Sequence, residues 1–177
     1  CGSGGMILTQ DNVRSEKARY LTTQAKDDQE KFIHNEIGYN YRMSNVQAAI
    51  GCAQLERLEQ RVKKKKKIHQ MYELRLEEQE NFDIHKPSDV TNSNYWLMIL
   101  KIKNSFITPF DLMDKLKTQS IESRPIWQLN HLQNPYKACQ TYNIENSYEL
   151  LNSSLCIPSS PDLEDEDVVR VVGALSE

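Results

Sequence analysis

The chain has 177 residues, of which 38% are hydrophobic and 27% are charged, and its 22 basic and 25 acidic side chains leave a formal net charge of −3. This composition is typical of a folded globular protein and excludes a disordered chain. The slightly acidic balance excludes a general nucleic-acid binder, which needs a surplus of positive charge. No apolar run has the length that a membrane-spanning helix requires.

The cysteines and the first residues indicate the setting of the protein. Four cysteines are scattered singly, without a CxxC pair, which favours reduced thiols in a cytoplasmic protein over a zinc or redox motif.

The chain opens with Cys1, and three of its six glycines fall within the first five positions. We expect a piece of a longer protein that begins inside a loop. A processed or engineered start is the alternative.

The first half of the chain predicts two helices around an ordered loop. The long second helix carries a stripe of small residues, which another backbone can approach closely. In order, we expect a strand at 5–10, a helix from Asp11 or Asn12 to about 26, an aromatic loop at 32–45, and a helix from Ser44 or Asn45 to about 80.

The second half alternates strands with helices, which predicts a small α/β domain from about residue 85 onward. The expected elements are a strand at 95–102, a helix to about 119 that Thr108 and Pro109 begin, a strand or extended segment at 121–127, loop and short helix at 130–142, a helix at 145–153 and a strand at 155–158. The acidic run at 162–167 opens a final helix whose inner face is Val168, Val172 and Leu175.

The run Lys63–Lys67 is conspicuous but uninformative about function. Five consecutive lysines point all round a helix, so they cannot all face one phosphate backbone. Acidic neighbours at helical spacing supply opposite charge. We interpret the run as a solvated helix face rather than a nucleic-acid patch.

The four histidines, His34, His69, His85 and His131, show no metal-ligand spacing, so a metal site is not expected. We expect His69 to face solvent, and a structural role is the simplest interpretation of each histidine. No G-x-S-x-G elbow is present.

Two clusters are candidates for binding. The segment 38–51 places the Asn40 amide and the Arg42 guanidinium just before a capped helix, where both can donate to a phosphate or carboxylate. A packed turn with Arg42 stacked on Tyr39 or Tyr41 is an equal alternative. The sequence SRPIW, with Trp96 as a further aromatic residue, places Arg124 at a strand end where ligands of α/β sheets often bind. A structural Arg124 covering Trp127 is the alternative.

Five segments in their order and spacing resemble one family, and the resemblance covers essentially the whole chain. The chain resembles the C-terminal half of the DegT/StrS pyridoxal-phosphate-dependent sugar-nucleotide aminotransferases. SNYWL with RPIW is most similar to the branch that aminates C4 of UDP-linked 4-keto-6-deoxy-N-acetylhexosamines. The segments are GSGGMILTQD at 2–11, GYNYRMSNVQAAIGCAQLERL at 38–58, SNYWL at 93–97, SRPIW at 123–127 and LCIPSSPDL at 155–163.

The resemblance implies the α/β fold of a type I pyridoxal-phosphate-dependent aminotransferase. It assigns residues 1–43 to the end of the large-domain sheet and an interface loop, 44–84 to the long connecting helix, and 85–177 to the small C-terminal α/β domain. It further implies a homodimer with shared active sites, no nucleic-acid or membrane partner, and pyridoxal 5'-phosphate as cofactor. An amino-acid donor, usually glutamate, would load the amine, and a keto sugar linked to a nucleotide would accept it.

The residues that match the family motifs are assigned by this resemblance. Asn40 would reach the cofactor phosphate or substrate of the neighbouring subunit, and Tyr41 belongs to the substrate side of the same motif. Arg42, Gly4 and Gly5 would lie beside the cofactor. A further set would contact the sugar nucleotide, with His34 a weaker candidate and His131 weaker still: Arg124, Pro125, Ile126 and Trp127.

The family's Schiff-base lysine precedes the glycine cluster, so it would lie before Cys1 and outside these residues. The resemblance therefore implies no catalytic residue within the chain and an inactive chain in isolation. Two alternatives remain: a dehydratase or lysine-less relative with the same fold, and a non-enzymatic protein that binds an acidic partner through its long basic helix.

Overall fold

The computed structural model describes residues 2–28, 30–88, 90–103 and 106–176. The chain divides into two compact units, residues 1–58 and 59–177, and each is described here by itself. Cys1 and its expected place in a loop lie outside the described residues. Among the described residues no helix is long and apolar enough to cross a bilayer.

The first unit contains α1 (Asn12–Thr22), the loop that follows it, and α2 (Asn45–Glu56). Asp11 caps α1 by accepting a hydrogen bond from the backbone N–H of Arg14, as the sequence predicted. The helix ends before residue 26 because Gln24 and Ala25 take left-handed φ angles of 71° and 48°. No side chain of α1 or α2 is buried, so this unit carries little core of its own.

The strand expected at 5–10 is not formed. Residues 5–9 are neither helix nor strand, and Met6, Ile7 and Leu8 are 72%, 69% and 86% exposed. An apolar run predicts a strand only where a neighbouring strand accepts its backbone hydrogen bonds. The described part of the first unit supplies no such neighbour to this run.

The long helix expected from 44 or 45 to about 80 is two helices, α2 and α3 (Leu58–Leu76). Arg57, with φ −104° and ψ 1°, leaves the helix, and its N–H bonds back to the carbonyls of Gln54 and Leu55. The apolar period runs through this interruption of one residue, which is why the sequence did not indicate it.

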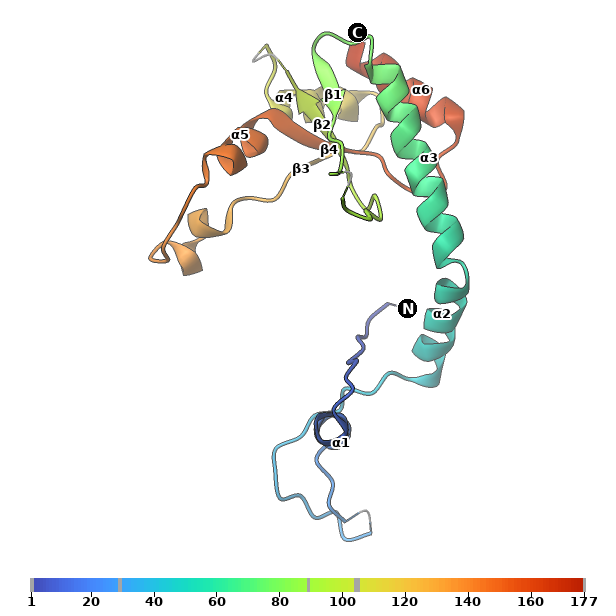
Figure 1. Cartoon of the computed structure of the whole chain (residues 1–177), viewed down its shortest axis with the longest axis vertical. Helices are drawn as coiled ribbons and strands as arrows, with labels where there is room; N and C mark the ends of the chain where they lie inside the picture. Colours follow the sequence, from blue (N-terminus) through green and yellow to red (C-terminus); the bar gives the residue numbers. More distant parts are fainter. Residues whose placement is uncertain (1, 29, 89, 104–105, 177) are drawn as a thin grey trace. The chain divides into compact units, whose positions relative to one another are not determined.

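The second unit is built on a four-stranded antiparallel sheet in the order β1-β2-β4-β3 (Figure 1). Its strands are β1 (Phe82–Ile84), β2 (Met98–Ile102), β4 (Ser154–Ile157) and β3 (Arg124–Pro125). β1 is too short for its alternation to predict it from sequence. β3 is an edge strand of two residues, which suits Pro125 because proline has no N–H to donate.

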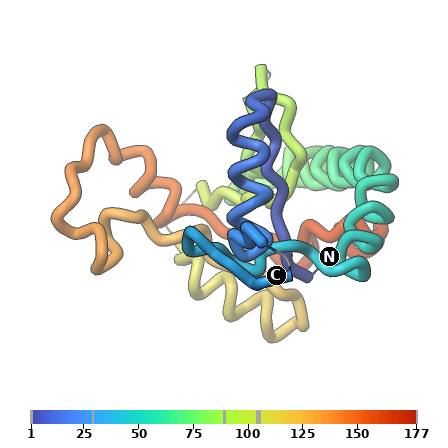
Figure 2. The backbone as a smooth tube through the Cα atoms, turned by 90° about the horizontal axis from the view of Figure 1, so that it is seen from below, coloured from blue at the N-terminus to red at the C-terminus, as the bar shows by residue number. Residues whose placement is uncertain are grey.

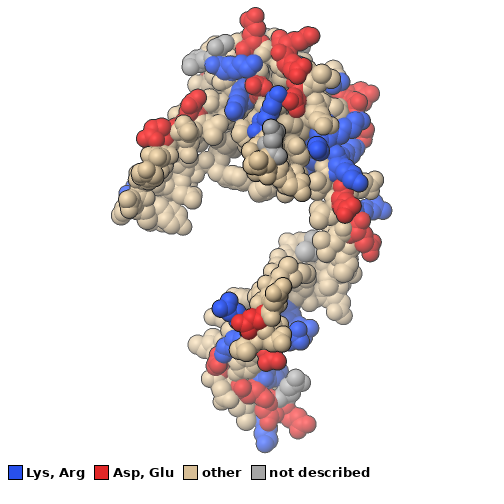
Figure 3. Space-filling view, viewed as in Figure 1, with Lys and Arg blue, Asp and Glu red and all other residues tan. Residues whose placement is uncertain are grey.

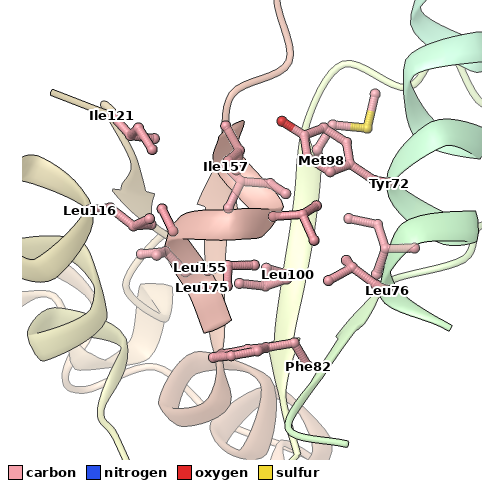
Figure 4. Packing of buried hydrophobic residues seen from close by; sticks show 14 of the residues in the cluster. Tyr72, Leu76, Phe82, Met98, Leu100, Leu116, Ile121, Leu155, Ile157 and Leu175 are labelled. Carbon is pink, nitrogen blue, oxygen red and sulfur yellow. The ribbon is translucent and has the colours of Figure 1, made fainter. Parts of the chain in front are cut away.

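Three helices complete the core of this unit: α3, α4 (Pro109–Thr118) and α6 (Asp165–Ser176). Leu100 lies opposite Ile84 on one neighbouring strand and Leu155 on the other, so the three side chains share one face of the sheet. Tyr72 and Leu76 of α3 and Leu116 of α4 point toward these strands (Figure 4).

A long segment, 126–153, leaves the sheet between β3 and β4. It contains two short 3₁₀ turns, η1 (Asn130–Leu132) and η2 (Asn134–Tyr136), and returns through α5 (Glu145–Ser153). Figures 1 and 2 both show it extending away from the sheet. Because β3 and β4 pair directly, both ends of this segment are fixed side by side.

Candidate functional site

The first unit contains a groove of about 670 Å³ between the glycine segment and the loop before α2. It brings together four of the residues expected at the cofactor, Gly4, Gly5, Asn40 and Arg42, and with them Tyr41. Its other lining residues are Ser3, Met6, Ile7, Thr22, Met43 and Gln47.

The Asn40 side of this groove is held by pairing with the end of α1. The N–H of Tyr39 donates to the Leu21 carbonyl at 2.7 Å, and that of Tyr41 donates to the Thr22 carbonyl at 3.1 Å. Asn40 lies between them and forms an antiparallel bridge with Thr23. The backbone of Asn40 is therefore fixed while its side chain remains exposed.

Gly38 permits this pairing. A Cβ atom at position 38 would lie 2.2 Å from the backbone nitrogen of Ala25 and 2.3 Å from the carbonyl carbon of Gln24. Any side chain there would push the two backbones apart. Next to this contact, the rings of Tyr39 and Tyr41 stack with centroids 4.9 Å apart.

The glycine side of the groove is tied to the beginning of α2. Ser44 and Gln47 form a capping box, in which the Ser44 hydroxyl accepts from the Gln47 N–H at 3.3 Å. The Gln47 side-chain amide donates to the Ser3 hydroxyl at 2.7 Å. Gly4, with φ 131°, follows directly and has a backbone conformation that only glycine adopts readily.

The donors in this groove suit an anion. Arg42 is the one charged residue among the described lining residues, and the Asn40 amide and Ser3 hydroxyl add neutral polar groups. The groove also lies beside the N-terminus of α2, where the helix dipole favours negative charge. A phosphate group fits this donor set.

His34 lies outside the groove lining. Its Nδ1 lies 2.8 Å from the Gln24 carbonyl oxygen, which braces the loop after α1. Asp27 holds the same loop by accepting from the N–H of Asn35 at 2.7 Å and from the Tyr20 hydroxyl at 2.9 Å. These bonds, led by that from Asn35, lower the pKa of Asp27.

The second unit carries a groove of about 390 Å³ beside Arg124. The Arg124 side chain is 77% exposed, and its guanidinium forms an ion pair with Glu122, Nη2 to Oε1, at 2.7 Å. The opposite wall belongs to the connection between β4 and α6, and the Ser123 hydroxyl, which also lines the groove, is buried with no hydrogen-bond partner. The described lining residues are Leu97, Glu122, Ser123, Arg124, Cys156, Ile157, Pro158, Ser159 and Ser160.

The remaining residues of the RPIW motif do not line this groove. Pro125 and Ile126 line a separate pocket of about 270 Å³ with Phe110 and Leu151. Trp127 packs against Trp96, with ring centroids 5.5 Å apart and planes tilted by 43°. His131 contacts Tyr148 through its Nε2, 2.9 Å from the phenol oxygen.

The Lys63–Lys67 run is only partly the solvated face that the sequence predicted. Lys64 and Lys67 form ion pairs with Glu164 and Asp165 at the beginning of α6, at 2.9 and 3.7 Å. Lys65 is partly buried against backbone carbonyls. Figure 3 shows the basic side chains of α3 with acidic ones beside them.

The expectation that His69 faces solvent is wrong. Its side chain is buried, its ring centroid lies 4.9 Å from that of Tyr95 with the planes tilted by 54°, and its Nε2 lies 3.0 Å from the His85 carbonyl oxygen. The residues described contain no cluster of three or more histidine, cysteine or acidic side chains that could hold a metal ion.

Some polar groups at these grooves gave no signal in the sequence. Ser3 and Gln47 meet across many intervening residues, and Ser123 and Ser159 come together only when β3 pairs with β4. Lone serines and glutamines occur throughout any soluble chain. Only Ser44, as one of the two predicted helix caps, indicated a local structure.

The sequence matches the family model of the DegT/DnrJ/EryC1/StrS aminotransferase family over residues 1–176. It is 33% identical over 176 residues to the putative pyridoxal phosphate-dependent aminotransferase EpsN of Bacillus subtilis, covering 97% of this chain and 45% of that protein. It is 31% identical over 179 residues to a GDP-perosamine synthase of Caulobacter vibrioides, covering 99% of this chain and 48% of that one.

Solved structures show the same fold. The aminotransferase TlmJ from Streptoalloteichus hindustanus superposes with a TM-score of 0.81 at 22% identity, over 94% of this chain and 44% of that one. PseC from Helicobacter pylori, an aminotransferase involved in the biosynthesis of pseudoaminic acid, gives 0.82 at 17% identity, over 95% and 46%. The chain thus spans about half the length of the relatives it matches.

The fold and the family match define part of a type I aminotransferase fold, which confirms the expected fold class. The chain belongs to the DegT/DnrJ/EryC1/StrS aminotransferase family, whose aminotransferases depend on pyridoxal phosphate.

Proposed function

We propose that the full-length protein is a pyridoxal-phosphate-dependent aminotransferase. It transfers an amino group from glutamate to the C4 keto group of a nucleotide-linked 4-keto-6-deoxy sugar, in the synthesis of sugars for bacterial cell-surface glycans. The observation that carries the proposal is the groove in which Asn40, Arg42, Gly4 and Gly5 meet, in a chain of this family.

In this proposal Asn40 and Arg42 hold the phosphate of the neighbouring subunit's cofactor, and the glycine segment lets its backbone approach the bound group. Pyridoxal phosphate, when bound, supplies the electron sink that aminotransferase chemistry needs. The described lining of the groove holds no lysine. We therefore propose that the amine that bonds the cofactor comes from outside these 177 residues and that the chain alone is inactive.

We further propose that two copies of the full-length protein share their active sites in a homodimer. The exposed Asn40 and Tyr41 side chains are then available to the neighbouring subunit's cofactor or substrate, and His34 braces their loop. The exposed Met6, Ile7 and Leu8 provide apolar surface for such contacts. The division into 1–43, 44–84 and 85–177 belongs to this proposal.

The sugar nucleotide is proposed to contact the segment Arg124–Trp127. The exposed Arg124 guanidinium suits a phosphate, and Pro125, Ile126 and Trp127 offer apolar surface beside it. A cytoplasmic setting agrees with the free thiols of Cys52, Cys139 and Cys156.

The alternative of a non-enzymatic protein that binds an acidic partner is less well supported. Lys64 and Lys67 pair with acidic side chains of the same unit and Lys65 is partly buried against carbonyl groups, so most of the charge of this run already has a partner within the chain.

The test separates the two half-reactions of the full-length protein. Incubation with pyridoxal phosphate and glutamate should release 2-oxoglutarate and change the visible absorbance of the cofactor. Later addition of a UDP- or GDP-linked 4-keto-6-deoxy sugar should give the C4 amino sugar by mass spectrometry. A dehydrated sugar in its place would favour the dehydratase alternative, and no product from either sugar would contradict the proposed substrate.

A further inference from the structure

Lys65 differs from the other lysines of its run in what it contacts. Its Nζ lies 2.5 Å from the carbonyl oxygen of Ser159 and 3.0 Å from that of Trp96, and 3.4 Å from the Ser159 hydroxyl. An ammonium group has three donors, and three acceptors converge on it here. Lys64 and Lys67, in contrast, pair with exposed carboxylates.

Partial burial of the Lys65 ammonium group costs free energy unless hydrogen bonds satisfy its donors. Burial lowers the pKa of this ammonium, because removal from water disfavours the charged form. The partners of its Nζ are a hydroxyl and two carbonyl groups, which offer oriented dipoles but no countercharge. An apolar side chain of similar length would fill the space but would not draw the two carbonyl groups together, because it has no N–H to donate.

The two segments that Lys65 joins are far apart in sequence. Trp96 precedes β2 and Ser159 follows β4, and the Ser159 hydroxyl donates directly to the Trp96 carbonyl at 3.0 Å. Lys65, Ser159 and Trp96 thus form a closed triangle, which we call the Lys65 clamp. Tyr72, two turns further along α3, donates to the Pro158 carbonyl at 3.1 Å and holds the same connection.

The clamp lies directly behind the surfaces proposed to meet the sugar nucleotide. Ser159 forms one wall of the groove whose other wall includes Arg124, and Leu97, the neighbour of Trp96, also lines it. The ring of Trp96 packs on Trp127. A shift of the Trp96 backbone would therefore change both the groove and the indole pair.

We propose that Lys65 is a positioning residue that fixes the Trp96–Trp127 pair and the Ser159 wall of the Arg124 groove for nucleotide-sugar binding. This inference rests on the proposed function for the identity of the ligand. The Lys65 clamp itself does not depend on the proposed function, because a spectroscopic measurement tests it without substrate.

The experiment compares Lys65→Met with Lys66→Met in the full-length protein, because Lys66 is the exposed neighbour on the same helix. Two indoles this close couple as excitons in far-ultraviolet circular dichroism, and the difference between wild type and Trp127→Phe isolates their couplet. We expect Lys65→Met to lose most of this couplet and Lys66→Met to retain it. A retained couplet in Lys65→Met, or an equal loss in both variants, overturns the proposal.

The kinetic measurement then addresses the ligand. Lys65→Met should raise KM for the nucleotide sugar about tenfold while the glutamate half-reaction keeps its rate, whereas Lys65→Gln, which retains two donors, should recover most of the loss. If the couplet disappears and KM does not change, the clamp stands and the proposed role of Trp127 in substrate binding fails.

If Lys65→Met does not fold, Ser159→Ala replaces it. This variant removes the hydroxyl from the triangle and leaves both carbonyl contacts of Lys65. We expect a smaller couplet and a smaller rise in KM, in the same direction, and an unchanged couplet overturns the proposal.

Discussion

Gly38 and Ala25 are in backbone contact so close that a Cβ atom on Gly38 would lie 2.2 Å from the Ala25 nitrogen. The contact joins the left-handed turn after α1 to the strand-like segment that carries Asn40. The position of the Asn40 amide in the groove therefore depends on the absence of a side chain two residues earlier.

Gly38→Ala should destabilise the full-length protein by ~2 kcal/mol or more, because backbone atoms, which cannot rotate away, meet the new methyl group. It should also weaken binding of pyridoxal phosphate. The measurements are thermal unfolding and cofactor titration. Gly173→Ala is the matched control: Gly173 is exposed in α6 with nothing near its Cβ position, so alanine should stabilise that helix by about 1 kcal/mol. Equal behaviour of the two variants would contradict this account of Gly38.

Asn40→Ala should raise the Kd of the full-length protein for pyridoxal phosphate about tenfold or more, because a hydrogen bond to a charged group contributes ~1.5–3 kcal/mol. The change is read by titrating the visible absorbance of the cofactor. Asn45→Ala removes a similar exposed amide outside the groove lining and should leave Kd within about twofold. An unaltered Kd in Asn40→Ala would contradict the assignment of Asn40 to the phosphate.

Arg124→Gln should raise KM for the nucleotide sugar about tenfold, equivalent to ~1.4 kcal/mol, and leave the glutamate half-reaction unchanged. Glu122→Gln provides the comparison, because Arg124 and Glu122 are paired at the surface. If Arg124 binds the nucleotide sugar, Glu122→Gln frees its guanidinium, and KM for the sugar should be equal to or lower than that of the wild type. If the ion pair only supports the fold, the two variants should raise KM alike, and that result would contradict the assignment.

Tyr72 makes the second unit sensitive to alkaline pH. Burial and, to a smaller extent, the charge of Asp167 raise the pKa of this phenol above its ordinary value. A pKa raised in the folded state gives stability that is fully present below the unfolded value of about 10 and is lost as the pH rises toward the folded value. Unfolding temperatures above about pH 10 should therefore fall less steeply in Tyr72→Phe than in wild type.

Near neutral pH the same variant should cost about 1 kcal/mol, since it also removes the hydrogen bond to the Pro158 carbonyl. Tyr142→Phe is the control, because Tyr142 is 81% exposed. A parallel alkaline decline in Tyr72→Phe and wild type would contradict the role of Tyr72.

The sequence predicted best those elements whose signals are local. The Thr108 cap with Pro109 marked the beginning of α4, and the buried face of α6, including Val168, Val172 and Leu175, followed from its period. The strand expected at 5–10 failed because an apolar run does not reveal whether a pairing partner is present.

The candidate site was predictable in its residue types and not in its contacts. Asn40 and Arg42 stood out because an amide and a guanidinium precede a capped helix. The Gly38–Ala25 approach and the Lys65 clamp depend on segments that meet only after folding. In a run of five lysines the sequence does not indicate which one is buried, because that depends on the position of two carbonyl groups distant in sequence.

The segment 126–153 has a consequence for how far the length of the chain can vary at this place. Its two ends are held together by the pairing of β3 with β4, and the entropy of closing a loop grows only with the logarithm of its length, about 0.6 kcal/mol for each doubling. A change in the length of the segment therefore alters the free energy of closing it only slightly, provided that α5 keeps its contacts with β2. The sheet can thus accept a connecting segment of another length at this place without a large entropic penalty.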